Sequence, residues 1–258
     1  MNQKQYKKIL VIKQGSLGDI VFALPAMYSI RFYFEHSKIT LLTESKFVNF
    51  LKKSKYFDHF LIDNRKGLWK TINVILKVLS NKYDLIIDLQ NSKRSNFYNF
   101  FLKFLSKAKI NGSRSNSHYR YLIPEQGVES PRVGLFKQLS MLSIPEVKTD
   151  YNWLDIDLDF NNVKNTILFI PGVSQSGLRK QWNPNLFAQL AKYFEDKGFL
   201  ICVVGTKMDF SSVEPILQIC KNVVNKIDQS PPEVVYTIAK RSHLIISNDT
   251  GPGHIAAL

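Results

Sequence analysis

The sequence contains 258 residues, 45% of them hydrophobic and 12% aromatic, and has a formal net charge of +14. This length and composition predict a folded protein of one or two domains. The two cysteines exclude a disulfide framework and a cysteine-based metal site, and Cys202, inside an apolar run, is expected to pack in the core of a cytoplasmic protein.

The positive charge predicts an anionic partner, which could be nucleic acid, an acidic lipid surface or a phosphorylated substrate, unless it reflects only a Lys-rich surface. No zinc-finger spacing or ribonucleoprotein-type aromatic motif accompanies the basic residues, so nucleic acid is the weaker candidate. No segment reaches the length of a transmembrane helix, and the basic N-terminus lacks the pattern of a signal peptide.

The first half of the chain alternates short apolar runs with segments of helical periodicity. Strands are predicted at residues 8–12, 39–43, 60–62 and 85–88, and helices at residues 20–34, 47–51, 69–79 and 96–105. Pro25 is expected to kink or interrupt the first helix. The last helix is rich in aromatic residues, which we expect to face the core, although they could instead face a lipid-like acceptor. These residues are Phe97, Tyr98, Phe100, Phe101 and Phe104.

The pattern lapses over residues 142–162, which we interpret as a linker with a peripheral strand near residues 153–156. Strands are then predicted at residues 166–170, 200–204, 222–224 and 244–246, and helices at residues 185–197, 213–220, 233–239 and from residue 255. Alternation of this kind is typical of parallel α/β sheets. The predicted fold is therefore α/β, with two Rossmann-like doubly wound domains facing a ligand cleft. They comprise residues 1–148 and 164–258, joined by a linker at residues 149–163.

The turn at residues 15–19 follows the first predicted strand and contains Gly15, Gly18 and Asp19. Carboxyl ends of parallel strands carry the ligand sites of α/β folds, and the glycines allow a tight turn open to a ligand. Asp19 could cap the following helix, which is a common use of Asp, or it could accept a proton from a substrate hydroxyl.

Two later loops could bind a phosphorylated ligand. Lys180 could neutralise a diphosphate and Ser174 or Ser176 could bond its oxygens, although Lys180 could also be a solvated surface cation. After the strand at residues 200–204, Asp209 could hold a ribose or serve as a cap.

The last motif, residues 247–254, joins an apolar strand to a helix through a turn of small residues. Such a turn directs backbone N–H groups and a helix N-terminus at one point, which suits a diphosphate. Asp249, Thr250 and His254 add polar side chains, although a similar turn also occurs at purely structural crossovers.

Together these motifs resemble glycosyltransferase family 9, the ADP-heptose:lipopolysaccharide heptosyltransferases. The resemblance rests on the turn at residues 15–19 followed by Pro25, on residues 83–90, on Pro171-Gly172 with Lys180, and on residues 248–257. The motifs follow the family's order over nearly the whole chain.

The resemblance implies a GT-B fold and inverting, metal-independent transfer of heptose from ADP-heptose, without a cofactor, to a lipopolysaccharide inner-core or lipid A acceptor. It implies that Asp19 is the general base and that Lys180 stabilises the leaving diphosphate. The expected donor-binding residues are Ser174, Ser176, Lys180, Asp209, Asp249, Thr250, Gly251, Gly253 and His254. The expected acceptor-binding residues are Gly15, Gly18, Lys93, Arg94 and Arg120. The expected location is cytoplasmic, peripheral to the inner membrane.

Two departures from the family pattern are visible. Gly253 stands where the family usually carries a bulkier apolar residue. The sequence stops at Leu258, inside a predicted helix, whereas family members continue through further strands and helices, so we expect a C-terminally truncated chain with an incomplete second domain. The alternatives are a non-catalytic binding or scaffold protein with the same fold, and a basic nucleic-acid binder.

Overall fold

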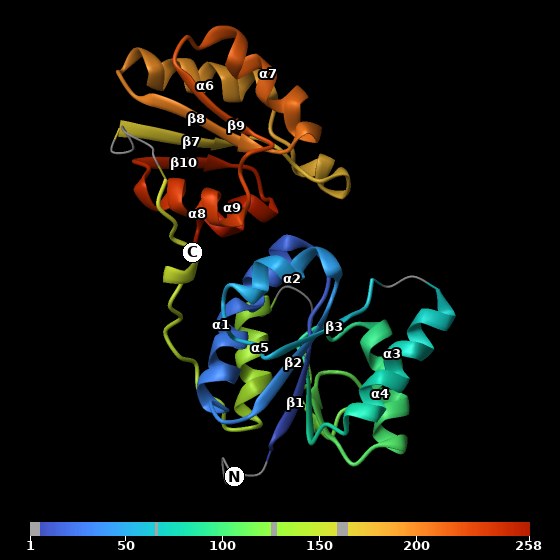
Figure 1. The fold of residues 1–258 in the computed structure, drawn as a ribbon. Coiled ribbons are helices and arrows are strands. Elements are labelled where there is room, and N and C mark those ends of the chain that lie inside the picture. Colours follow the sequence, from blue (N-terminus) through green and yellow to red (C-terminus); the bar gives the residue numbers. More distant parts are fainter. Residues whose placement is uncertain (1–5, 65–66, 125–127, 159–164) are drawn as a thin grey trace. The chain divides into compact units, whose positions relative to one another are not determined.

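The computed structural model describes residues 6–64, 67–124, 128–158 and 165–258, apart from the side chains of Leu68, Gln175 and Ser176. The chain forms two compact units, unit 1 (Met1–Asp150) and unit 2 (Tyr151–Leu258) (Figure 1). The predicted linker at residues 149–163 includes residues 159–163, which lie outside the described part of the chain.

Unit 1 contains a parallel sheet with the strand order β3-β2-β1-β4-β5-β6. Its strands are β1 (Lys8–Ile12), β2 (Lys38–Thr43), β3 (His59–Ile62), β4 (Leu85–Asp88), β5 (Lys109–Gly112) and β6 (Tyr119–Arg120). In the central strands Val11 lies opposite Leu41 and Ile87. This order is that of a doubly wound Rossmann sheet, which collects the loops after β1 and β4 at its carboxyl edge.

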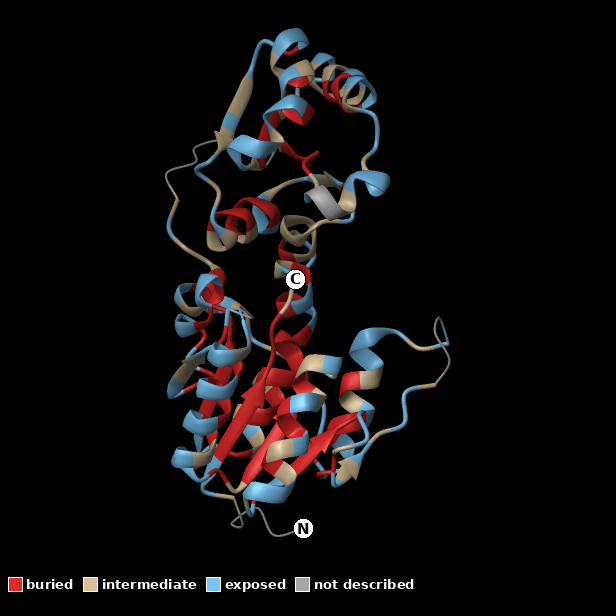
Figure 2. Cartoon of the chain, turned by 90° about the vertical axis from the view of Figure 1, so that its right-hand side faces the viewer, coloured by how far each residue is buried: buried red, intermediate tan, exposed pale blue. Residues whose placement is uncertain are grey.

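The helices of unit 1 cover both faces of the sheet. They are α1 (Leu17–Tyr33), α2 (Ser45–Lys52), α3 (Leu68–Asn81), α4 (Lys93–Leu105) and α5 (Pro131–Ser140). Helices α1 and α5 pack together on one face, and α3 and α4 pack together on the other (Figure 1). The apolar strands between these layers are buried (Figure 2). Burial on both faces explains why β1 and β4 are continuous apolar runs.

Unit 2 contains a smaller parallel sheet with the order β10-β7-β8-β9. Its strands are β7 (Thr166–Ile170), β8 (Leu200–Gly205), β9 (Val223–Ile227) and β10 (Leu244–Ser247), and its helices are α6 (Pro184–Asp196), α7 (Phe210–Ile219), α8 (Pro232–Arg241) and α9 (Gly251–Ala256). Helices α6 and α7 pack on each other, as do α8 and α9. The prediction of two Rossmann-like α/β domains is therefore confirmed.

Several local predictions are wrong. Residues 153–156 form no strand; a short 3-10 helix, Asn152–Leu154, buries Leu154 instead. The predicted interruption at Pro25 does not occur, since α1 runs on through it with the neighbouring residues Leu24 and Ala26 buried, while the predicted kink stays a prediction. The sequence analysis also missed β5, β6 and α5, whose short or polar segments lack apolar periodicity.

The aromatic residues of α4 do not all face the core. Tyr98 is 1% exposed, whereas Phe97, Phe100 and Phe104 are 43%, 46% and 70% exposed. A single helix cannot turn five closely spaced aromatic residues toward one side, since adjacent positions differ by about 100° around its axis.

Candidate functional site

The turn after β1 places Asp19 at the carboxyl edge of the unit 1 sheet. Ser16 caps α1, and the Asp19 carboxylate accepts hydrogen bonds from the Ser16 amide at 2.7 Å and from the Ser16 hydroxyl at 2.8 Å. Gly15 has a φ of +114°, and a Cβ there would lie 2.5 Å from an Asp19 carboxylate oxygen. Asp19 thus caps the helix, as one of the two interpretations predicted, while its side chain stays solvent-exposed.

A buried lysine lies close to this turn, and the sequence analysis missed it. Lys13 follows β1 directly, is 9% exposed, and donates to the Leu89 carbonyl oxygen at 3.4 Å. Burial lowers the pKa of Lys13, while the carboxylates of Asp19 and Asp88 act in the opposite direction. A charged residue directly after an apolar strand is the signal that could have identified it.

The buried carboxylate of Asp88, at the end of β4, fixes the neighbouring turn. It accepts from the amides of Gln90 at 3.0 Å and Asn91 at 2.9 Å, and from the Asn99 side chain at 2.8 Å. Burial raises the pKa of Asp88, and these hydrogen bonds oppose that shift. The Gln90 side chain accepts from the Gln14 amide at 3.0 Å, so the turns after β1 and β4 are linked.

The predicted acceptor-binding cations occupy different surroundings. The Arg94 guanidinium pairs with the buried carboxylate of Asp63 at 3.2 Å and donates to the Thr71 hydroxyl at 2.9 Å. Lys93, the first residue of α4, and Arg120, at the end of β6, are both exposed. Arg94 is therefore committed to a structural ion pair, and the acceptor-binding roles of all three cations stay predictions.

In unit 2 the structure brings together three of the predicted donor-binding residues. Lys180 ends a short 3-10 helix (Gln175–Lys180) after β7, and Asp249 follows the neighbouring strand β10. The Lys180 ammonium pairs with one oxygen of the Asp249 carboxylate, and the His254 imidazole lies 3.2 Å from the other. Lys180 lowers the pKa of Asp249, so this carboxylate is ionised at neutral pH.

Asn248 holds the two loops of this cluster in register. Its side-chain amide donates to the Pro171 carbonyl oxygen at 2.8 Å, and its side-chain oxygen accepts from the Trp182 amide at 3.0 Å. The Trp182 ring packs edge-on against Phe187, with ring centroids 4.8 Å apart. The sequence analysis quoted Asn248 in a motif but assigned it no role.

The turn into α9 explains the departure at Gly253. A Cβ at this position would lie 2.4 Å from the Ser247 hydroxyl and 3.0 Å from the Asn248 carbonyl oxygen, so a larger residue would have to displace the Ser247 side chain and press on the Asn248 backbone. Thr250 is the N-cap residue and Gly251 begins the helix. The first amides of a helix have no intrahelical acceptor and are available to oxygen atoms of a ligand.

The remaining predicted donor-binding residues are less informative. The Asp209 carboxylate accepts from the Thr206 amide and hydroxyl, both at 2.8 Å, and fills the space beside Gly172, where a Cβ would lie 2.3 Å from it. Its ribose-binding role stays a prediction. Ser174 is exposed, and the side chain of Ser176 lies outside the described part of the chain.

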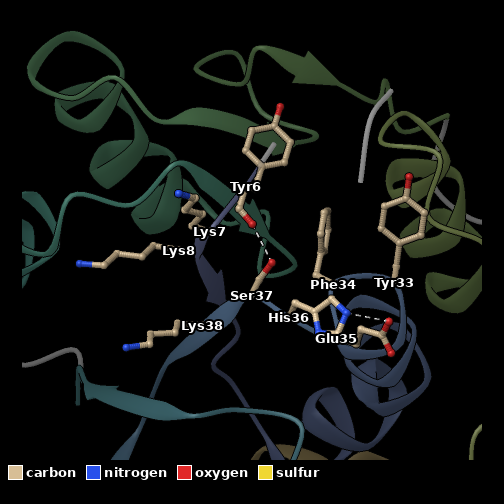
Figure 3. Close-up of a pocket in the computed structure, with 9 residues that line it drawn as sticks. All are labelled: Tyr6, Lys7, Lys8, Tyr33, Phe34, Glu35, His36, Ser37 and Lys38. Carbon is tan, nitrogen blue, oxygen red and sulfur yellow. Dashed lines mark hydrogen bonds and ion pairs between the residues drawn. The ribbon is translucent and has the colours of Figure 1, made fainter. Parts of the chain in front are cut away.

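A cavity of about 780 Å³ lies at the opposite, amino edge of the unit 1 sheet (Figure 3). It is lined by residues 6–8 at the start of β1 and residues 33–38 between α1 and β2. The Ser37 hydroxyl donates to the Tyr6 carbonyl oxygen at 2.6 Å across it. None of the predicted site residues lines this cavity.

The described residues lack two further features. No helix there is long and apolar enough to cross a membrane. Among the same residues, no group of three or more His, Cys, Asp and Glu side chains is arranged to hold a metal ion.

Comparisons with known proteins point to one family. The model of glycosyltransferase family 9 (heptosyltransferase) matches residues 72–258. Lipooligosaccharide heptosyltransferase 2 of Haemophilus ducreyi is 25% identical over 97% of this chain and 79% of its own length.

Two solved structures have the same fold. A glycosyl transferase family 9 protein from Veillonella parvula superposes with a TM-score of 0.75 at 20% identity, over 99% of this chain and 78% of that protein. The E. coli heptosyltransferase WaaC, solved with ADP-2-deoxy-2-fluoro heptose, gives 0.74 at 18% identity, over 97% of this chain and 85% of that protein.

Proposed function

Because the chain belongs to glycosyltransferase family 9 and is a glycosyltransferase, we propose that it transfers heptose from ADP-heptose to the inner core of a lipopolysaccharide or lipooligosaccharide. The relative in Haemophilus ducreyi is a lipooligosaccharide heptosyltransferase, which supports this acceptor class. The E. coli protein of the same fold was solved with an ADP-heptose analogue, which supports this donor. The net charge of +14 suits an anionic acceptor at the cytoplasmic side of the inner membrane.

The observation that carries the proposal is the contact of Lys180 and His254 with Asp249. These residues come from two neighbouring strand ends and were each predicted to bind the donor. Asp249 holds the ammonium and imidazole groups in place before the donor binds, which reduces the entropy lost on binding. In the proposed complex Lys180 and the amides near Gly251 stabilise the diphosphate as it leaves.

Asp19 is the proposed general base. In the transfer step, the acceptor hydroxyl oxygen forms a bond to the anomeric carbon, and the bond from that carbon to the diphosphate oxygen breaks with its electron pair passing to ADP. The hydroxyl proton passes to the Asp19 carboxylate. Attack opposite to the departing ADP inverts the anomeric configuration. Lys180 supplies the positive charge at the leaving group, so the proposed step uses no metal ion and no cofactor.

The capping bonds of Asp19 are compatible with this role. They fix the carboxylate while leaving the side chain exposed to solvent. A base whose rotamer is already fixed loses less conformational entropy on reaching a bound hydroxyl than a mobile base does.

The test measures ADP release, product mass and, by NMR, the anomeric configuration of the product, with ADP-heptose and a deacylated core acceptor, with and without EDTA. The proposal predicts inverted heptosyl product at the same rate in both conditions. Calorimetry with ADP should show weaker binding by Lys180→Ala than by Lys197→Ala, a matched change at the end of α6. Absence of product with intact ADP binding would reject the donor sugar or acceptor, and equal ADP binding by the two variants would reject the donor site.

A further inference from the structure

Helix α3 carries an exposed apolar stripe on its outer side. Trp69, Ile72 and Leu76 are 80%, 36% and 57% exposed. Their spacing of three and four residues places them on one side of the helix. The opposite side, with Val74 and Val78, is buried in the unit 1 core. The stripe therefore lies outside the core-facing side of α3.

Helix α4 repeats the same arrangement. Phe97, Phe100 and Phe104 are 43%, 46% and 70% exposed and follow the same spacing. The rings of Phe100 and Phe104 contact each other with centroids 5.2 Å apart, and Phe97 contacts Phe101 at 5.0 Å. The core side of the helix carries Tyr98 and Leu102 instead.

The two helices pack side by side on one face of the sheet (Figure 1). Figure 2 views unit 1 from the right-hand side of Figure 1, where these two helices lie. We define the α3/α4 face by six of the exposed apolar residues of these two helices. They are Trp69, Ile72, Leu76, Phe97, Phe100 and Phe104. Clustered large apolar side chains of this kind mark an interaction surface.

The charges around the α3/α4 face have one sign. Neither helix contains an Asp or Glu residue. Lys70, Lys77 and Lys107 are exposed and Lys103 is half-buried, whereas the one Arg of the two helices, Arg94, pairs with Asp63. Aromatic rings beside lysines fit the boundary between acyl chains and anionic headgroups. The same charges disfavour a second copy of this chain on the face, because like charges would meet.

We propose that the α3/α4 face docks unit 1 on an anionic lipid bilayer, with the aromatic and aliphatic side chains entering the headgroup boundary and the lysines contacting lipid phosphates. Helices α1, α3 and α4 all begin after strands that end at the carboxyl edge of the sheet. Asp19 lies in the first turn of α1. If the proposed function holds, docking would thus bring a lipid-anchored acceptor to the sheet edge that carries Asp19.

The test is flotation with phosphatidylcholine vesicles that contain phosphatidylglycerol. The double variant Phe100→Gln/Phe104→Gln should bind these vesicles at least about tenfold more weakly than the unmodified chain, because two rings no longer enter the boundary. The matched control is Phe32→Gln, since Phe32 is 58% exposed on α1, which lies on the other face of the sheet. The control should bind normally, and vesicles without phosphatidylglycerol should bind weakly.

A second readout identifies the inserted residue. Brominated lipids should quench the fluorescence of Trp69. The Trp69→Phe variant should lose this quenching and still bind the vesicles. Equal vesicle binding by the double variant and the Phe32→Gln control would overturn the proposal. If the double variant loses a dimer that the unmodified chain forms, and its vesicle binding does not change, the lipid proposal is overturned and the α3/α4 face binds a second copy of the chain.

Activity separates this proposal from the proposed function. The double variant should transfer sugar to a water-soluble, deacylated acceptor at the normal rate. Vesicle binding without any sugar transfer would leave the docking surface standing and reject the proposed function. Sugar transfer without vesicle binding would support the proposed function and reject the docking surface.

Discussion

Replacing Arg94 by Ala tests whether this residue holds the fold or the acceptor. The change leaves the Asp63 carboxylate, 1% exposed, without its cation. Two contacts to Asp63 would be lost, at 3.2 Å and 3.4 Å, together with one to the Thr71 hydroxyl at 2.9 Å. Tyr98 and Gln14 would still donate to Asp63, at 2.5 Å and 2.9 Å. The expected loss is therefore about 2–3 kcal/mol of unfolding free energy, below the full cost of an isolated buried charge.

Urea unfolding followed by circular dichroism measures this loss, with Lys93→Ala as the matched control. Lys93 is the exposed neighbour on α4, so its replacement should change stability by less than about 0.5 kcal/mol. Adding Asp63→Asn to Arg94→Ala should recover part of the loss, because the buried group is then neutral. The structural interpretation fails if Arg94→Ala unfolds like the control and instead raises the KM for the acceptor.

Three other predictions follow from local geometry. Gly253→Ala should cost about 1–2 kcal/mol in urea unfolding through overpacking, whereas Gly134→Ala, whose Cβ would meet its nearest atom at 3.7 Å, should be neutral or stabilising. Lys180→Ala should raise the pKa of Asp249 in an NMR titration. In the unmodified chain this ion pair stabilises the fold at pH values above the ordinary Asp pKa, and the stabilisation is lost as the pH falls through the lowered pKa of Asp249. Burial raises the pKa of Cys202 to about 12, so a thiol reagent at neutral pH should modify it only after unfolding. An unchanged unfolding free energy of Gly253→Ala would contradict the first prediction. An unchanged pKa of Asp249 in Lys180→Ala would contradict the second, and rapid modification of Cys202 in the folded chain would contradict the third.

The regular elements could be predicted where apolar runs are continuous. Strands β1, β4 and β7 begin and end at the predicted residues, because burial on both faces of a parallel sheet demands uninterrupted apolar sequence. Helix α5 was missed because Gly134 and polar residues obscure its periodicity. Its buried Gln138 is held by a donor bond to the Asp88 carbonyl oxygen at 3.1 Å, a contact between residues distant in sequence.

Some residues of the candidate site could likewise be predicted from the sequence and others could not. Lys180, Asp249 and His254 could be predicted together because each follows a strand end in a recognisable motif, and neighbouring parallel strands bring such ends together. Arg94 could not be assigned from the sequence, because its partner Asp63 follows a different strand. Pairing between these two loops depends on the order of strands in the sheet.

Asp19 as general base is the central claim, and the measurement that tests it most directly compares Asp19→Asn with Ser16→Ala in the heptosyl transfer assay. Both variants lose capping bonds of α1 and should lose about 1 kcal/mol of stability. The account predicts that Asp19→Asn binds ADP normally but loses at least about a hundredfold in kcat, while Ser16→Ala keeps most of its activity. Equal kcat values in the two variants would show that Asp19 only caps the helix.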